Sequence, residues 1–196
     1  GDEGGFAPNL PANEDGLRYM VRAIESAGYS VEEMGIAMDV AATEFHKEDG
    51  YHMDGKVLTS EELANVYSGW LDEYPILSIE DGFGEDDWRG WTDFTKREGH
   101  RVQSVGDDLF VTQSERLAQG IELGAANAML VKLNQVGTVT ETLEAMDLAT
   151  SNGFNNVISH RSGETEDVTI ADLAVGTRAG QIKTGAPARS DRVAKY

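Results

Sequence analysis

The chain has 196 residues and a formal net charge of -19, with 35 acidic against 16 basic residues and no cysteine. This length is enough for one domain with a real core. The negative charge disfavours nucleic acid or an anionic membrane surface as the main partner, and the absence of cysteine excludes disulfides and thiolate metal sites. No apolar run approaches the roughly 18 residues that a membrane span requires.

The first part of the chain predicts a loop, a helix, a strand and a hairpin. Glycine and proline punctuate residues 1–9, which we expect to form a loop without a signal-peptide pattern. Asn13 is placed to cap a helix that runs to about Ala27, and Gly28 suits its C-terminal end. An apolar run then ends at Asp39, and two Asp-Gly pairs after it indicate a small hairpin.

A capping box opens the next predicted helix, because Thr59 is followed three residues later by Glu62. An apolar run ending at Glu80 and Asp81 predicts another strand. The elements expected after it are a turn and short helix at 84–95, a strand ending at Asp107, a helix at 114–123, a strand ending before Lys132, a helix at 138–149 with Val139, Leu143, Met146 and Leu148 on its apolar face, a strand ending at Ser159, a helix at 165–177, and a last strand ending near Lys183 with no helix after it.

This alternation of strand and helix predicts a parallel sheet with helices outside it. Six candidate strands each end at a polar residue. In a (β/α) barrel the C-terminal ends of the strands converge on one face, where the chemistry sits, and a closed barrel has eight strands. We therefore expect about six βα units of such a barrel, forming part of a longer protein, and no domain boundary within the chain.

Three acidic residues, Asp39, Glu80 and Asp107, end three successive predicted strands. Carboxylates that converge repel one another unless a positive charge lies between them. Hard oxygen ligands in this number suit Mg²⁺. The alternative is that each acid merely caps a helix or forms a salt bridge. Their equivalent positions at strand ends favour the metal site.

Two lysines also end predicted strands. Lys132 follows a buried apolar run, and beside a cation its pKa would fall, so that it can serve as a general base. Lys183 can support that base electrostatically or hold a substrate carboxylate. The alternative for Lys183 is a solvated lysine at the end of a strand.

Polar residues in two loops complete the candidate set. Arg161 can bind a phosphate through two hydrogen bonds, and Ser162 can add a hydroxyl donor. Alternatively, Arg161 pairs with a nearby acid such as Glu164. Glu3 lies between glycines, and a loop carboxylate that closes over a site can act as an acid. The residues alone support this role for Glu3 only weakly.

Seven stretches together resemble the enolase (phosphopyruvate hydratase) family: GDEGGFAP, AMDVAATEF, SIEDGF, VGDDLFVT, LVKLNQVGTVTET, VISHRSGETED and IKTGAPARSDRVAKY. The resemblance runs from end to end. It implies the C-terminal part of an enolase-type TIM barrel in a cytoplasmic, glycolytic hydro-lyase that interconverts 2-phosphoglycerate and phosphoenolpyruvate with Mg²⁺, and it implies a homodimer or higher oligomer for the intact protein.

The resemblance also implies a role for each candidate residue. Metal ligands would be Asp39, Glu80 and Asp107, the base at C2 would be Lys132, and the acid at the C3 hydroxyl would be Glu3. The substrate contacts would be His160, Arg161, Ser162 and Lys183.

Other functions remain open at this point. An enolase has an N-terminal domain and further strands that this chain lacks, so we expect the chain alone to be inactive or to act as a binding surface. Another enzyme of the superfamily, which abstracts a proton next to a carboxylate, is a further alternative. The pair Arg161 and Ser162 argues against it, because a phosphate clamp has no purpose there.

Overall fold

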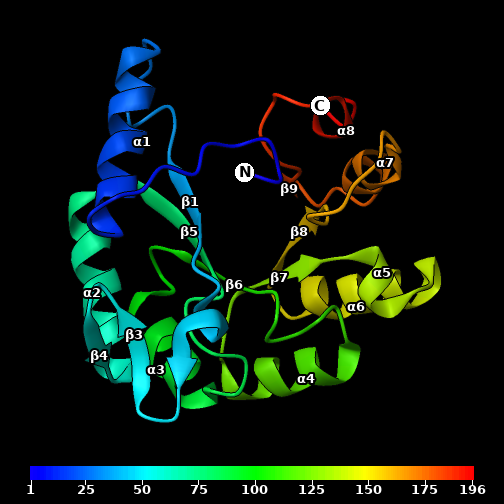
Figure 1. Cartoon of the computed structure of the whole chain (residues 1–196). Coiled ribbons are helices and arrows are strands. Elements are labelled where there is room, and N and C mark those ends of the chain that lie inside the picture. The colour runs from blue at the N-terminus through cyan, green and yellow to red at the C-terminus, as the bar shows by residue number, and fades with distance from the viewer. The chain divides into compact units, whose positions relative to one another are not determined.

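The computed structural model describes residues 1–196, and the chain divides into two compact units. The carboxylate unit contains Asn9–Leu109 and Gly120–Asn127, and the lysine unit contains Gly1–Pro8, Phe110–Gln119 and Ala128–Tyr196. The names reflect the predicted site residues, because the three carboxylates lie in the first unit and the two lysines in the second. The elements are labelled in chain order in Figure 1.

The carboxylate unit combines a parallel sheet with a small antiparallel one. Strand β5 pairs in parallel with β1 on one side and with β6 on the other. Strands β2, β3 and β4 form an antiparallel sheet, in the place where the two Asp-Gly pairs predicted a hairpin. The elements of this unit are α1 (Glu14–Ser26), β1 (Ile36–Asp39), a 3-10 helix η1 (Ala42–Phe45), β2 (His46–Lys47), β3 (Gly50–Met53), β4 (Lys56–Leu58), α2 (Ser60–Glu73), β5 (Ile76–Glu80), α3 (Trp88–Glu98) and β6 (Gln103–Gly106).

The lysine unit repeats the same parallel arrangement, with β8 paired to β7 on one side and to β9 on the other. Its elements are β7 (Ala128–Val131), α5 (Leu133–Val136), α6 (Val139–Ser151), β8 (Asn155–Ser159), α7 (Thr169–Gly176), β9 (Ile182–Lys183) and α8 (Ser190–Val193), and α4 (Ser114–Leu123) has residues in both units. Each unit thus confirms the predicted alternation of parallel strands and helices.

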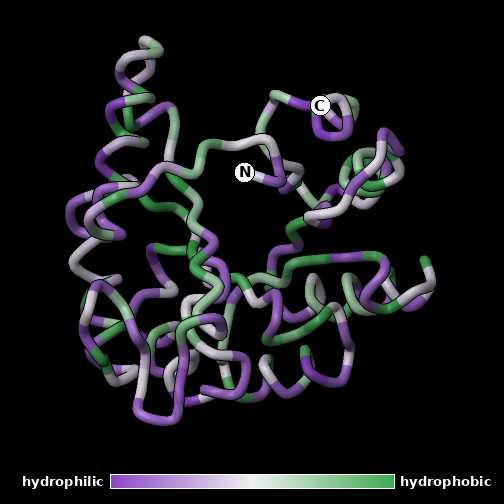
Figure 2. Tube along the Cα trace, viewed as in Figure 1, coloured by the Kyte–Doolittle hydropathy of each residue, from purple (hydrophilic) through white to green (hydrophobic).

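Apolar burial accounts for both units. All four residues of β7 are buried, and Figure 2 colours this strand as hydrophobic, which fits a strand covered on both faces. In the carboxylate unit, Tyr67 and Phe83 pack edge to face with ring centroids 5.8 Å apart, and Phe94 lies 5.6 Å from Phe83. Such aromatic pairs add to the stabilisation that burial alone provides.

Helix boundaries follow local sequence signals where those signals are strong. The capping box of α2 forms as predicted, with Thr59 Oγ1 accepting from the backbone N–H of Glu62 at 3.2 Å. Helix α4 has the predicted bounds. Helix α1 begins at the expected place, but the Asn13 side chain does not cap it. That side chain instead donates to Asp54 Oδ1 at 2.9 Å, which ties α1 to the β3–β4 turn.

Three other expectations are wrong in detail. The buried face of α6 is formed by small residues, Thr142, Ala145 and Ala149, together with Met146, whereas Val139 is 56% exposed. Helix α7 begins at Thr169 rather than near residue 165. A one-turn helix, α8, follows the last strand, where no helix was predicted.

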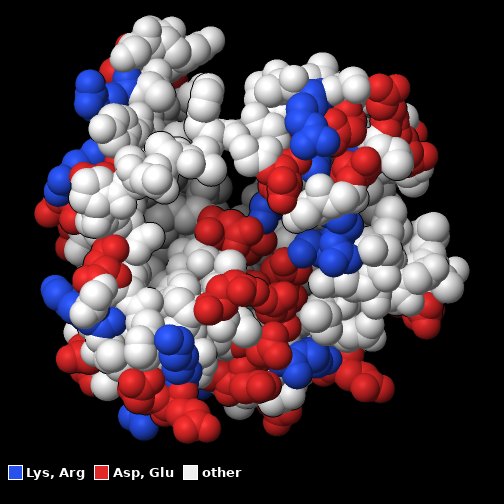
Figure 3. All heavy atoms as spheres, viewed as in Figure 1, with Lys and Arg blue, Asp and Glu red and all other residues white.

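No helix in the structure is both long enough and apolar enough to cross a membrane. On the face drawn in Figure 3, acidic side chains outnumber basic ones, in line with the net charge of -19.

Candidate active site

Strand register places two of the three predicted carboxylates, Asp39 and Glu80, on one side of the parallel sheet in the carboxylate unit. Asp39 pairs with Glu80 across β1 and β5, and Glu80 pairs with Val105 across β5 and β6. Paired residues of neighbouring strands share a face, and so do residues two apart along a strand. Asp107 lies two positions after Val105. The side chains of Asp39 and Glu80 therefore share a side, and Asp107 follows directly after the end of β6.

Burial of these carboxylates fits a cation. Glu80 is 7% exposed and Asp107 is 8% exposed, whereas Asp39 is exposed. Burying a carboxylate costs free energy unless a positive charge or hydrogen-bond donors compensate for it. The donor set consists of oxygen atoms only, which are the ligands that Mg²⁺ prefers. These residues therefore fit a magnesium ion.

A fourth acid, Asp81, holds the turn after β6 through hydrogen bonds. The sequence alone did not assign it a role. One Asp81 carboxylate oxygen accepts from the backbone N–H of Asp107 at 2.8 Å, and the other accepts from that of Asp108 at 2.9 Å. Asp81 has a positive φ of 44°, an uncommon conformation for a residue other than glycine. Burial raises the pKa of Asp81 to about 7, and the two backbone donors act in the opposite direction.

The acidic cluster that the structure shows differs from the predicted trio. Asp81, Asp107 and Asp108 have carboxylate atoms within 4.8 Å of one another, and only Asp107 belongs to the predicted trio. Both oxygens of Asp81 already accept backbone hydrogen bonds, so we assign Asp81 to positioning the turn after β6. The signal that sequence reasoning left unused was the second acid of each pair, Glu80–Asp81 and Asp107–Asp108.

Register also relates the two lysines of the lysine unit. Val131 pairs with Ile158, so the next residue, Lys132, is level with Ser159, which pairs with Lys183. The two lysines accordingly flank the end of β8 on the same side of the sheet. The Lys132 backbone is anchored as well, because its N–H donates to Thr112 Oγ1 at 3.0 Å.

Glu3 reaches the loop after β8 in the lysine unit, across 159 positions of sequence. Ser162 Oγ donates to Glu3 Oε1 at 3.3 Å, and His160 Nε2 lies 3.3 Å from Glu3 Oε2. The Glu3 backbone carbonyl accepts from Ala186 at 3.0 Å. Gly185 makes this approach possible, because it has a φ of 85° and a Cβ there would lie 2.9 Å from the Glu3 carbonyl oxygen.

His160 and Arg161 differ sharply in exposure. His160 is 2% exposed. Burial lowers its pKa below the ordinary value, the Glu3 carboxylate opposes that shift, and the cations Arg192 and Lys183 add to it. Arg161 is exposed, and its guanidinium donates to Asn134 Oδ1 at 2.7 Å. Glu164 bonds the backbone N–H of Arg161, at 3.1 Å, rather than forming the side-chain pair that was considered as an alternative.

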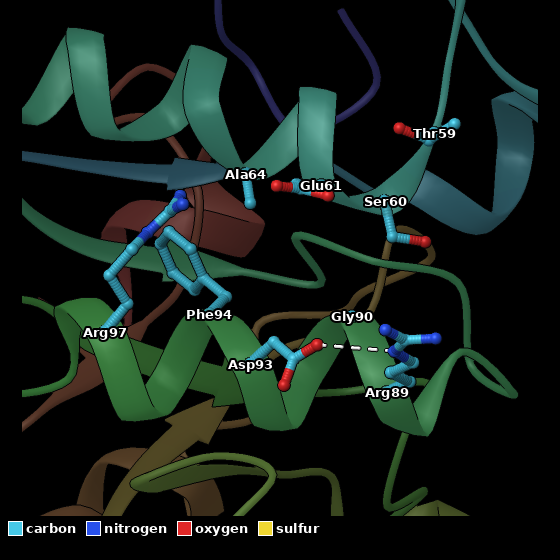
Figure 4. A pocket seen from close by; sticks show the side chains of 9 residues that line it. All are labelled: Thr59, Ser60, Glu61, Ala64, Arg89, Gly90, Asp93, Phe94 and Arg97. Carbon is cyan, nitrogen blue, oxygen red and sulfur yellow. Dashed lines mark ion pairs between the residues drawn. The ribbon is translucent and has the colours of Figure 1, made fainter.

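A pocket of about 560 Å³ lies between α2 and α3, and Figure 4 shows its lining. Its charged groups interact with other side chains of the unit: Arg89 pairs with Asp93 at 3.5 Å, and Arg97 donates to Asn65 at 2.9 Å. None of the predicted site residues lines it. We therefore regard this pocket as separate from the candidate site.

Parallel strands that alternate with helices in each unit, with polar residues at or directly after the strand ends, define the class of (β/α)-barrel domains. Comparison with known proteins supplies the family. The model of the enolase C-terminal TIM barrel domain matches residues 1–196, so the chain belongs to this family.

Two curated relatives named enolase support this assignment. The protein from Kineococcus radiotolerans is 59% identical over 197 residues, covering 100% of this chain and 46% of the relative. The protein from Natranaerobius thermophilus is 57% identical over 199 residues, covering 100% of this chain and 47% of the relative. The chain thus spans about half the length of the curated relatives it matches.

Proposed function

We propose that the protein containing this chain is an enolase, a hydro-lyase of glycolysis that reversibly dehydrates 2-phosphoglycerate to phosphoenolpyruvate in the cytoplasm. The observation that carries the proposal is the match of the enolase barrel family over residues 1–196, in a chain whose predicted acids and lysines lie at the ends of strands or directly after them. We also propose that the intact protein is a homodimer or a higher oligomer.

Asp39, Glu80 and Asp107 would hold Mg²⁺ in this enzyme. Their oxygen donors and the burial of two of them support this assignment. The bound ion would supply positive charge that stabilises negative charge on the substrate carboxylate. Asp81 would keep Asp107 in place through its hydrogen bond to the Asp107 backbone N–H.

Lys132 would take the proton from C2 of the substrate as the general base. Its backbone is held in place, because it follows a fully buried strand and its N–H donates to Thr112. Lys183, one strand beyond β8, would bind near the substrate carboxylate.

Glu3 would help the C3 hydroxyl leave, and Arg161 with Ser162 would bind the phosphate. Ser162 and Glu3 are in contact. This contact supports placing the phosphate-binding residue next to the acid that acts on the C3 hydroxyl. The loop around Glu3 is rich in glycine, which suits a segment that must close over a substrate. His160 would line the pocket beside Glu3.

The proposal is tested with the longest natural form of the protein and with its Lys132→Ala variant. Formation of phosphoenolpyruvate from 2-phosphoglycerate is followed by absorbance, with Mg²⁺ and after chelation. We expect turnover to require Mg²⁺ and to fall about 10²- to 10⁴-fold in Lys132→Ala, the usual contribution of a general base. The control is Lys56→Ala, since Lys56 is exposed on β4. Undiminished turnover in Lys132→Ala would refute the base assignment.

A further inference from the structure

Arg192 is a fully buried cation, 0% exposed, that the proposed reaction does not use. It lies on α8, the one-turn helix after the last strand. Burying a guanidinium is costly unless its donors are satisfied, so its partners indicate why it is there.

The partners of Arg192 all lie on the loop that carries the proposed phosphate-binding residues, apart from one acid on its own helix. Nη1 donates to the carbonyl oxygen of Arg161 at 2.8 Å, and Nη2 donates to that of Ser162 at 2.7 Å. Nη1 also lies 2.5 Å from His160 Nδ1. Asp191 forms an ion pair with Nε at 3.2 Å. One side chain thus holds three consecutive residues, 160–162.

The contact with His160 determines where the imidazole carries its proton. A guanidinium is always protonated and offers only donors, so His160 Nδ1 must be the acceptor in this contact. A neutral imidazole that accepts at Nδ1 carries its hydrogen on Nε2. Both the other tautomer and the imidazolium ion would direct an N–H of His160 against an N–H of Arg192.

We propose that Arg192 is a positioning residue that locks His160 in the neutral tautomer with its proton on Nε2, so that His160 serves the site as a fixed hydrogen-bond donor. The donor is buried and lies 3.3 Å from Glu3 Oε2 without hydrogen-bond geometry to a protein acceptor. It is therefore oriented to donate to a substrate oxygen beside Glu3. The use of this donor in catalysis rests on the proposed function.

Burial and the charges around His160, taken together, also favour the neutral imidazole. Burial and the cations Arg192 and Lys183 lower its pKa, and the carboxylates Glu3 and Glu164 act in the opposite direction. A lowered pKa in the folded state keeps the ring neutral. The stability linked to this histidine is then fully present above its unfolded pKa of about 6.5 and is lost as pH falls toward the folded value.

The test is the ¹⁵N NMR spectrum of histidine-labelled protein in its longest natural form, recorded without metal or substrate. A spectrum of the variant His160→Gln assigns the His160 signals. We expect Nδ1 to have the shift of an unprotonated ring nitrogen and Nε2 that of a protonated one, with this pattern maintained below the ordinary histidine pKa of about 6.5. A proton on Nδ1, or an imidazolium at neutral pH, would overturn the proposal.

Variants of Arg192 test the cause of the tautomer. In Arg192→Gln, with the cation removed, we expect mixed tautomers and titration of His160 at a higher pH than in the wild type. In Arg192→Lys, the positive charge and one donor nitrogen remain. We expect a tautomer ratio between those of the wild type and of Arg192→Gln. The control is Arg178→Gln, because Arg178 is exposed in the same unit. Unchanged His160 signals in both Arg192 variants would contradict the proposal. If neither variant folds, the wild-type spectrum alone decides whether His160 has the proposed tautomer.

The pH profile distinguishes positioning from a general loss of structure. We expect the loss of kcat/KM in Arg192→Gln to be larger at about pH 8 than at about pH 6. At the higher pH, mixed neutral tautomers leave part of the His160 population without a proton on Nε2, whereas at the lower pH the imidazolium carries one there. An equal loss at both values would count against the role. Failure of this inference is separable from failure of the proposed function. Wild-type turnover without the Nε2–H tautomer overturns only the inference, whereas the tautomer without turnover overturns only the enolase activity.

Discussion

At the scale of single residues, Asp81 lends itself to a direct test. We expect Asp81→Asn to lower the free energy of unfolding by about 1–3 kcal/mol, because an amide has only one oxygen and leaves a buried N–H unsatisfied. We also expect Mg²⁺ affinity to fall roughly 10- to 100-fold as Asp107 loses its support. Urea unfolding and calorimetric Mg²⁺ titration measure the two effects, at about pH 8, where the Asp81 carboxyl, with its pKa of about 7, is ionised.

The control for this substitution is Asp147→Asn, on the exposed side of α6. Removal of a negative charge is common to both variants, so a difference between them isolates the hydrogen bonds to the turn after β6. Equal Mg²⁺ affinity in Asp81→Asn and in the wild type would rule out the positioning role.

Single residues also show where sequence reasoning reaches its limit. The last polar residue of a strand can be predicted, because apolar runs reveal where strands end, and Asp39, Glu80 and Lys183 lie at such ends. Asp81 and Arg192 could not be predicted in the same way. Their importance comes from side-chain contacts with backbone atoms of distant segments, and these contacts leave no periodic pattern in the sequence.

At the scale of elements, Tyr51 joins the β2–β4 sheet to the loop that follows β5. Its hydroxyl donates to Asp87 Oδ2 at 2.7 Å and accepts from the buried backbone N–H of Gly84 at 2.9 Å. Ser60, at the start of α2, donates to the same Asp87 oxygen at 2.6 Å. Burial and the Asp87 carboxylate raise the pKa of Tyr51 well above its usual range, so its hydroxyl remains a donor.

We expect Tyr51→Phe to destabilise the protein by about 1–3 kcal/mol, because the N–H of Gly84 loses its acceptor in a buried position. Hydrogen exchange of the Gly84 amide should become faster in this variant, and urea unfolding measures the change in stability. The matched control is Tyr19→Phe, since Tyr19 is 55% exposed on α1. An unchanged exchange rate at Gly84 would show that the hydroxyl does not hold this loop.

Elements with strong local signals were predicted better than those set by packing. The capping box fixed the start of α2, and the hydrophobic run fixed β7. The buried face of α6 was predicted from its largest apolar residues, but close packing admits small residues instead, and Val139 remains exposed. Helix α8 has only four residues, which is too short for a hydrophobic period to reveal it.

At the scale of the whole molecule, a ligand that binds only the folded state stabilises it by mass action. The three proposed ligands come from three strands, so the unfolded chain offers no comparable site. We expect Mg²⁺ at about 100 times its Kd to stabilise the full-length protein by about 2.7 kcal/mol. Thermal unfolding with and without Mg²⁺ measures this effect, and KCl at matched ionic strength controls for screening.

The same experiment on two variants identifies the site that couples binding to unfolding. Asp39→Asn should lose most of the Mg²⁺-dependent increase in Tm, whereas Asp147→Asn should keep it, although both remove one negative charge. Because Asp39 is exposed, its substitution should leave the metal-free protein folded, so the two effects can be separated. An equal increase in Tm for both variants would place the stabilising ion somewhere other than at the ends of β1, β5 and β6.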